Sequence, residues 1–174
     1  MKSWAQRERA LATLAKEVGY VKKPHGDRLR VALAFPNTYW VGMSNLGFQT
    51  VYRLFNREDD IVCERFFLPP KTELAELSAA KAPLLTLESQ TPVGDFDVVA
   101  FSVSFEWDYV NVLTLLRLAG IPARADARRG MRLGTARRRA PDARHRRLWI
   151  RHLVVRDHAG VPGVTAVLLA GFRH

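Results

Sequence analysis

The stretch RVALAFPNTYWVGMSNLGFQTVYRLFN, residues 30–56, places an apolar segment, a polar loop and an amphipathic segment in direct succession. Residues 30–35 form a short apolar run that ends at a proline, which is typical of a strand buried on both faces. Apolar side chains then recur in a broad stripe over residues 46–55, which predicts a helix capped by Ser44 or Asn45. A strand followed by a long polar, glycine-bearing loop and a helix indicates an α/β sheet with a functional loop.

The same alternation continues along the chain. Further strands are predicted at residues 61–68, 84–87 and 97–104, and further helices at residues 3–19, 72–80 and 109–119. Apolar strands that alternate with helices argue for an open parallel sheet with helices covering its faces.

Composition bounds the class of protein. The chain has 174 residues, of which 48% are hydrophobic, so it is long enough for one domain with a buried core. Cys63 is its only cysteine, which rules out an internal disulfide, and its place in a predicted strand favours core packing. We find no apolar run of about 18 residues and no secretory leader pattern, so we expect a cytoplasmic protein without membrane contact.

The net charge of +10 is confined to one end of the sequence. Residues 1–122 contain 14 Lys plus Arg and 14 Asp plus Glu, whereas residues 123–174 contain 13 Arg and 3 Asp. Residues 123–174 also lack Lys, Glu, Ser, Asn, Gln, Tyr and Cys, and their dominant residues have GC-rich codons. We therefore expect a non-native or disordered tail over 123–174, a domain over 28–122, and an N-terminal helix and linker over 1–27.

Two loops at the carboxyl ends of predicted strands, residues 36–47 and 104–108, are the candidate ligand site. In open parallel sheets, ligands bind at such ends, near the point where the strand order reverses. The residues that we expect to line a cofactor-binding cleft there are Asn37, Thr38, Tyr39, Met43, Ser44, Asn45, Gly47, Ser102, Ser104, Phe105 and Glu106. Trp40 and Trp107 either supply flat apolar walls or pack beneath neighbouring helices. The alternative is that both loops are ordinary connections with helix caps.

The other motifs in the sequence give weaker indications of function. GMSNLG, residues 42–47, lacks the GxGxxG spacing of dinucleotide-binding loops, and no P-loop lysine follows it. No histidine stands at metal-ligand spacing from a cysteine or carboxylate, so no metal site is expected. Glu106 and Asp108 are a carboxylate pair suited to acid–base work, but solvated loop carboxylates are the simpler interpretation. We assign no catalytic residue.

Several long stretches resemble one family. RVALAFPNTYWVGMSNLGFQTVYRLFN, VCERFFLP and LLTLESQTPVGDFDVVAFSVSFEWDYVNVLTLLRLAGIP are similar, in this order, to the N-terminal region of radical S-adenosylmethionine proteins. The resemblance covers about residues 20–122. It implies an incomplete Rossmann-like, cobalamin-binding-like α/β domain with a corrinoid or a neighbouring radical barrel at its ligand edge.

The resemblance also implies which cofactors belong to this chain. In the full-length family, a CxxxCxxC motif in the barrel holds a [4Fe–4S] cluster that binds and reductively cleaves S-adenosylmethionine to a deoxyadenosyl radical. This chain has no CxxxCxxC, so the cluster is not expected to bind here. It also lacks the DxHxxG motif that holds cobalamin through a histidine ligand, as the family does, and cobalamin is a candidate cofactor through the resemblance. After Pro122, the Arg-rich tail replaces the strand and glycine-rich turn that complete the family's cleft, which would leave an unpaired sheet edge.

The sequence thus indicates an N-terminal fragment of a radical S-adenosylmethionine protein that lacks the cluster domain and is inactive alone. One alternative is a nucleic-acid-binding protein whose basic patch, residues 137–147, contacts phosphates while Trp149 stacks on a base. Another is a small-molecule binding module without catalysis, using the same two loops. We do not expect nucleic acid as a partner.

Overall fold

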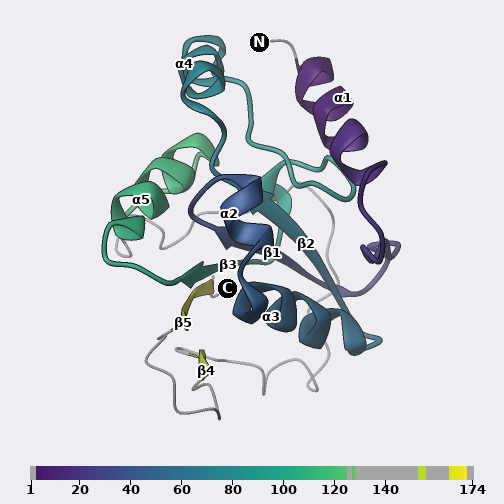
Figure 1. The fold of residues 1–174 in the computed structure, drawn as a ribbon. Helices are drawn as coiled ribbons and strands as arrows, with labels where there is room; N and C mark the ends of the chain where they lie inside the picture. Colours follow the sequence, from purple (N-terminus) through teal and green to yellow (C-terminus); the bar gives the residue numbers. More distant parts are fainter. Residues whose placement is uncertain (1–2, 125–126, 128–152, 156–164, 172–174) are drawn as a thin grey trace.

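A computed structural model describes residues 3–124 and 127 and the strands at 153–155 and 165–171 (Figure 1). Five helices and five strands lie in this part of the chain. Their order is α1 (Ser3–Leu14), β1 (Leu29–Phe35), α2 (Tyr39–Met43), α3 (Leu46–Arg57), β2 (Ile61–Phe67), α4 (Lys71–Ala80), a 3-10 turn (Val93–Asp95), β3 (Val98–Val103), α5 (Asp108–Leu118), β4 (Leu153–Val155) and β5 (Thr165–Gly171).

The strands form one sheet in the order β2-β1-β3-β5-β4. β1 pairs in parallel with both β2 and β3, so the expected open parallel α/β sheet with flanking helices is confirmed. β5 pairs antiparallel with β3, from Val98 opposite Gly171 to Val103 opposite Ala166, and β4 pairs antiparallel with β5. The expectation of an unpaired edge at β3 is therefore wrong, because residues 165–171 supply a strand there.

The sheet separates two apolar layers. On one face, alternate residues of β1 and β2 pack with Phe48, Val51 and Tyr52 of α3. On the other face, the intervening strand residues pack with Leu77 of α4 and with Val112 and Leu115 of α5. The alternation follows from the two-residue period of a strand, and it explains why β1 is apolar at every position from Val31 to Phe35.

Two predicted elements differ from the observed ones. Residues 84–87 are not a strand: they make one isolated bridge, between Leu85 and Pro92, and run beside β2, where the Leu87 amide donates to the Arg65 carbonyl at 2.7 Å. The loop after β1 contains the short helix α2, which the sequence pattern does not show. α2 lies close to the sheet because Gly42 has no side chain: a Cβ there would stand 2.6 Å from Cε1 of Phe67.

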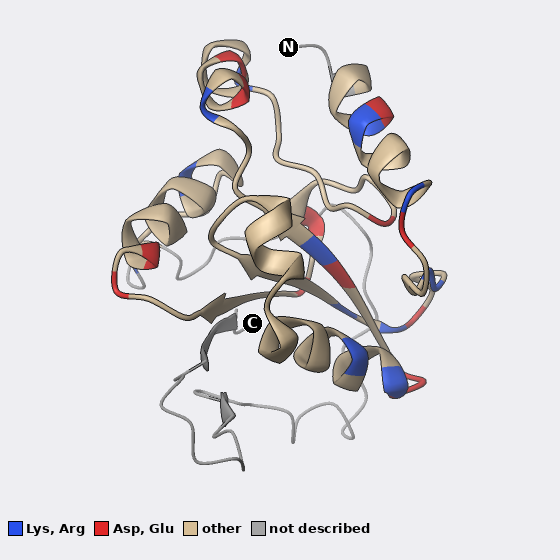
Figure 2. Ribbon diagram, viewed as in Figure 1, with Lys and Arg blue, Asp and Glu red and all other residues tan. Residues whose placement is uncertain are grey.

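The charged residues of the described part are mixed in sign, and Figure 2 shows a blue and a red band side by side within β2, at Arg65 and Glu64. The basic patch predicted at residues 137–147, and most of the predicted tail, lie outside the described residues. No helix in the described part of the chain combines the length and apolar character needed to cross a membrane.

Candidate functional site

The two predicted loops follow β1 and β3, at the place in the sheet where the strand order reverses. β1 has β2 on one side and β3 on the other, so the chain changes direction across the sheet between β1 and β3. The carboxyl ends of β1 and β3 lead into residues 36–47 and 104–108. These are the ends at which open α/β sheets bind ligands.

Side-chain hydrogen bonds hold the two loops together. Asn45 caps α3, because its Oδ1 accepts a hydrogen bond from the Phe48 amide at 2.9 Å. Its Nδ2 donates to the Oγ of Ser104 at 3.2 Å. Nδ2 of Asn111, in α5, donates to the Pro36 carbonyl at 2.9 Å. The loop after β1 is thus fixed to the segment after β3 at two places.

Buried polar atoms lie along β3 and at the start of α5. Ser102 has no exposed surface, and its Oγ has no hydrogen-bond partner among the described residues. Asp108 is 3% exposed, and its Oδ2 is also unpartnered within the described part. The expectation of a solvated pair holds for Glu106, which is exposed, but is wrong for Asp108.

Aromatic side chains stand out from the same edge. Trp40, Phe105 and Trp107 are 77%, 66% and 85% exposed. Trp40 follows the first residue of α2, and the other two lie between β3 and α5. The alternative that the two tryptophans pack beneath helices is therefore wrong, and the edge presents flat apolar surfaces to whatever lies against it.

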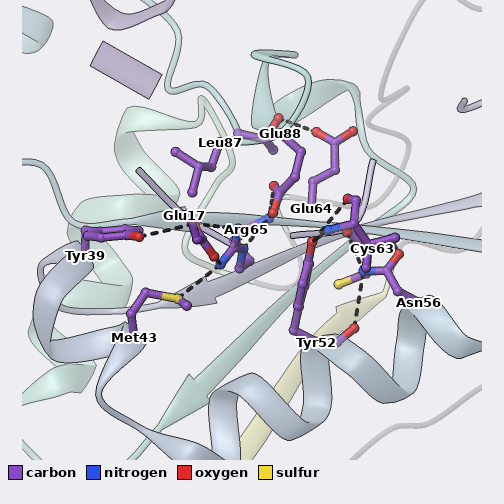
Figure 3. Close-up of polar contacts among 12 residues, drawn as sticks. Glu17, Tyr39, Met43, Tyr52, Asn56, Cys63, Glu64, Arg65, Leu87 and Glu88 are labelled. Carbon is purple, nitrogen blue, oxygen red and sulfur yellow. Dashed lines mark hydrogen bonds and ion pairs between the residues drawn. The ribbon is translucent and has the colours of Figure 1, made fainter. Parts of the chain in front are cut away.

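The remaining predicted site residues divide between two environments. Tyr39 and Met43 point toward the strand β2, where the Tyr39 hydroxyl donates to Glu17 Oε2 at 3.1 Å and the Met43 sulfur contacts Nη1 of Arg65 at 3.2 Å (Figure 3). The other four complete local structure. Asn37 Oδ1 accepts from the Thr38 amide at 2.8 Å, and the Ser44 hydroxyl donates to the Trp40 carbonyl at 2.7 Å. Gly47 lies in the first turn of α3.

An ion-pair network centred on Arg65 was not predicted. Arg65 lies in β2 on the face toward α3, with its guanidinium carbon 4.5 Å from the centre of the Tyr52 ring. Nε donates to Glu88 Oε1 at 2.6 Å, and the Arg65 amide donates to Glu88 Oε2 at 2.7 Å. Nη1 and Nη2 donate to the two oxygens of Glu17 at 2.5 and 3.1 Å. Figure 3 shows the two carboxylates on opposite sides of the guanidinium.

Burial sets the protonation behaviour of this network. Complete burial raises the pKa of Glu88 to about 7, although Arg65 opposes the shift. Burial alone would lower the pKa of Arg65, but the carboxylates of Glu88 and Glu17 raise it above its usual range. Burial and the Glu17 carboxylate also raise the pKa of Tyr39. The arginine therefore stays charged.

A second network occupies the opposite face of β2. Glu64 is 2% exposed and accepts hydrogen bonds from Thr86 Oγ1 and Ser89 Oγ, each at 2.6 Å, while His25 Nε2 lies 2.6 Å from its other oxygen. Burial would raise the pKa of Glu64, but these hydrogen bonds together lower it. The cluster fastens the linker before β1 and residues 86–91 to the sheet.

Two hollows border the described elements. One, of about 90 Å³, is lined by residues 17–19, Met43, Gln49, Tyr52, Arg53 and Arg65. The other, of about 460 Å³, lies between the carboxyl ends of α4 and α5, away from the predicted site. Among the residues that the structure describes, no three His, Cys, Asp or Glu side chains gather as metal ligands. Cys63 is buried as expected, and burial raises the pKa of its thiol.

Comparison with known proteins identifies one relationship. No curated protein and no solved structure matches the chain. Residues 47–132 match the family described as "Radical SAM proteins, N-terminal". The matched range begins at the start of α3, includes β2, α4, β3 and α5, and continues past the tail boundary expected near residue 123. This match supports a radical S-adenosylmethionine N-terminal domain in this chain.

Proposed function

We propose that this chain supplies the N-terminal, cobalamin-binding-like domain of a radical S-adenosylmethionine protein, with the loops after β1 and β3 as its ligand edge. The observation that carries this proposal is the hydrogen bond between Asn45 and Ser104, which holds the two loops together at the reversal point of the parallel strands. The family match over residues 47–132 supports the assignment of the domain.

The residues at this edge fit a corrinoid that is held by its ring face and its amide groups. Trp40, Phe105 and Trp107 offer exposed aromatic faces, and Ser102 and Asp108 bring buried oxygens that lack partners among the described residues. Neither loop contains a histidine. His25, in the linker before β1, is already engaged with Glu64. The fit is therefore to a corrinoid without a histidine ligand from these loops, which when bound would supply a cobalt centre for group or electron transfer.

The roles of this chain's own residues are positional. Asn45 and Asn111 hold the two loops in fixed positions relative to each other. The exposed aromatic side chains exclude water from the surface that contacts the corrinoid. Binding and cleavage of S-adenosylmethionine need a three-thiolate cluster, which one buried cysteine cannot hold. We therefore assign that chemistry to the radical barrel of the parent protein. The exposed aromatic edge would face this barrel across the corrinoid.

Equilibrium dialysis of the purified full chain against hydroxocobalamin, followed by its visible absorption, tests the proposal. We expect retention by the unmodified chain and a several-fold weaker retention by Trp107→Ala and by Ser104→Ala. Trp4→Ala is the matched control, because Trp4 is 61% exposed on α1 and lies in neither loop. Absence of retention, or equal losses in the edge and control variants, would overturn the corrinoid assignment.

A further inference from the structure

The guanidinium of Arg65 is bound by two carboxylates that differ in how firmly they are held. Glu88 has no exposed surface and bonds to both the side chain and the amide of Arg65. Glu17 comes from residues 15–21, which we call the strap. It meets the outer edge of the guanidinium with both oxygens, the paired arrangement by which arginine binds carboxylates.

The strap is the less firmly anchored partner. It follows the end of α1, and Val18 is fully exposed. Gly19 adopts a φ of 86°, a left-handed conformation that favours glycine. Its first residues continue the turn of α1, since the amides of residues 15–17 donate to the carbonyls of residues 11, 13 and 14. Beyond Glu17, the strap is fastened at Val21, whose side chain packs against the core and whose amide and carbonyl bond to the Tyr52 hydroxyl at 2.9 and 3.1 Å. Segments with few buried contacts open at low free-energy cost.

Beside the Glu17 carboxylate lies the cavity of about 90 Å³. Its wall includes Arg65 and also Arg53, whose exposed side chain makes no ion pair with the described residues. Among the described residues of this wall, Glu17 is the only acidic one. A volume of this size holds about three water molecules, and thus a carboxylate as small as acetate. The wall itself thus carries two guanidinium groups and one carboxylate, which favours an anion, although Glu88 also pairs with Arg65.

We propose that Arg65 is a carboxylate-binding site whose built-in occupant is Glu17, and that a small carboxylate entering the adjoining cavity replaces Glu17 and releases the strap. The ligand that we expect is a small free carboxylic acid, which Arg65 would bind through its carboxylate group. Glu17 stands in for this ligand in the closed arrangement. The inference concerns the face of β2 toward α3 and does not depend on a corrinoid at the loop edge.

Release of the strap would reach the loop after β1 through two contacts. Glu17 accepts the hydrogen bond of the Tyr39 hydroxyl, so its departure leaves Tyr39 without this partner. Arg65 also contacts the Met43 sulfur, at the other end of α2. One end of α2 thus contacts Glu17 and the other contacts Arg65. Binding of another acid to Arg65 would therefore change the contacts that hold α2 in place.

Limited trypsin digestion of the full chain tests this, because Lys16 lies in the exposed part of the strap. We expect cleavage after Lys16 to be faster in sodium acetate than in sodium chloride of equal ionic strength. Digestion of the denatured chain in the same salts corrects for effects on trypsin. In Glu17→Ala, we expect cleavage in chloride to rise on the order of tenfold, and acetate to raise the melting temperature by filling the vacated edge of Arg65.

Glu8→Ala is the matched control, since Glu8 is an exposed acid on α1, and it should behave as the unmodified chain does. Glu17→Gln, which keeps the shape of the side chain, replaces Glu17→Ala if the alanine variant does not fold. Equal cleavage rates of the unmodified chain in the two salts, or no acetate-specific rise in melting temperature for the Glu17 variant, would overturn the proposal.

Discussion

The amide of Asn45 bonds to the hydroxyl of Ser104 across 59 residues of sequence, while the other end of the same amide caps α3. One side chain therefore fixes both the start of a helix and the distance between the two loops at the strand ends. Such a double role is available to Asn because its amide has a donor and an acceptor on opposite sides.

Asn45→Ala should destabilise the chain by about 1–2 kcal/mol, because it removes the helix cap together with the bond between the loops. Ser104→Ala removes only the second bond and should cost less. Urea unfolding followed by circular dichroism measures both. Ser44→Ala is the control, since its exposed hydroxyl bonds only to the carbonyl of Trp40 within its own turn. A larger loss for Ser104→Ala than for Asn45→Ala would contradict the double role.

Gly42→Ala should also be destabilising, through overpacking rather than through backbone strain. The added Cβ would stand 2.6 Å from Cε1 of Phe67 and 2.9 Å from Cβ of Phe35, so α2 must move away from the sheet. We expect a loss of about 1–3 kcal/mol in the same unfolding measurement. Gly94→Ala is the comparison and should cost less, because the Cβ added there would stand 3.2 Å from the Ala119 carbonyl oxygen, a tight contact but a looser one than that at Gly42. Equal effects of the two substitutions would show that the contact with Phe67 does not limit the position of α2.

Cys63 should be inert in the folded chain at neutral pH. Its thiol is fully buried, and burial raises its pKa, so both access and thiolate content are low. We expect labelling by a disulfide reagent such as 5,5′-dithiobis(2-nitrobenzoate) to be slow in buffer and immediate in urea. Labelling at the denatured rate in buffer would mean that β2 is not packed between β1 and residues 84–92 as described.

Much of the fold was predictable because it rests on local pattern. The mainly apolar segments predicted as strands at 30–35, 61–68 and 97–104 are parallel strands, and the stripe over 46–55 lies in α3 with Asn45 as its cap. The prediction of a strand at 84–87 was wrong, because Leu84 and Leu87 are buried side chains of a loop that lies beside β2. Apolar character indicates burial, whereas strand pairing depends on partners that a single segment does not specify.

The position of the candidate site followed from topology, but its main polar network did not. Parallel strands place their carboxyl ends at one edge, so the proximity of Asn45 and Ser104 could be anticipated. Glu17 and Glu88 stand 48 and 23 residues from Arg65, and no spacing rule connects them. The one available signal was the pair of charges inside the apolar run IVCERFF, since buried charges require partners.

The Glu88 carboxyl should make stability depend on pH. Its pKa is raised to about 7 in the folded chain, from an ordinary value of 4.5. Between these values the folded state holds a proton that the unfolded state has released, so the free energy of unfolding falls as pH rises through this window. A shift of this size corresponds to about 3 kcal/mol. Glu64 acts below the window, because its lowered pKa gives stability that is lost as pH falls through the folded-state value.

We therefore expect a stability maximum near pH 4.5 to 5, with a decline toward pH 7.5, in urea unfolding experiments at a series of pH values. Glu88→Gln keeps an acceptor for Nε of Arg65 but cannot titrate, so it should lose most of the decline. Glu76→Gln, at an exposed position of α4, should retain the slope of the unmodified chain. A decline that persists in Glu88→Gln would assign the proton to another group and would mean that Glu88 is ionised against Arg65 throughout this pH range.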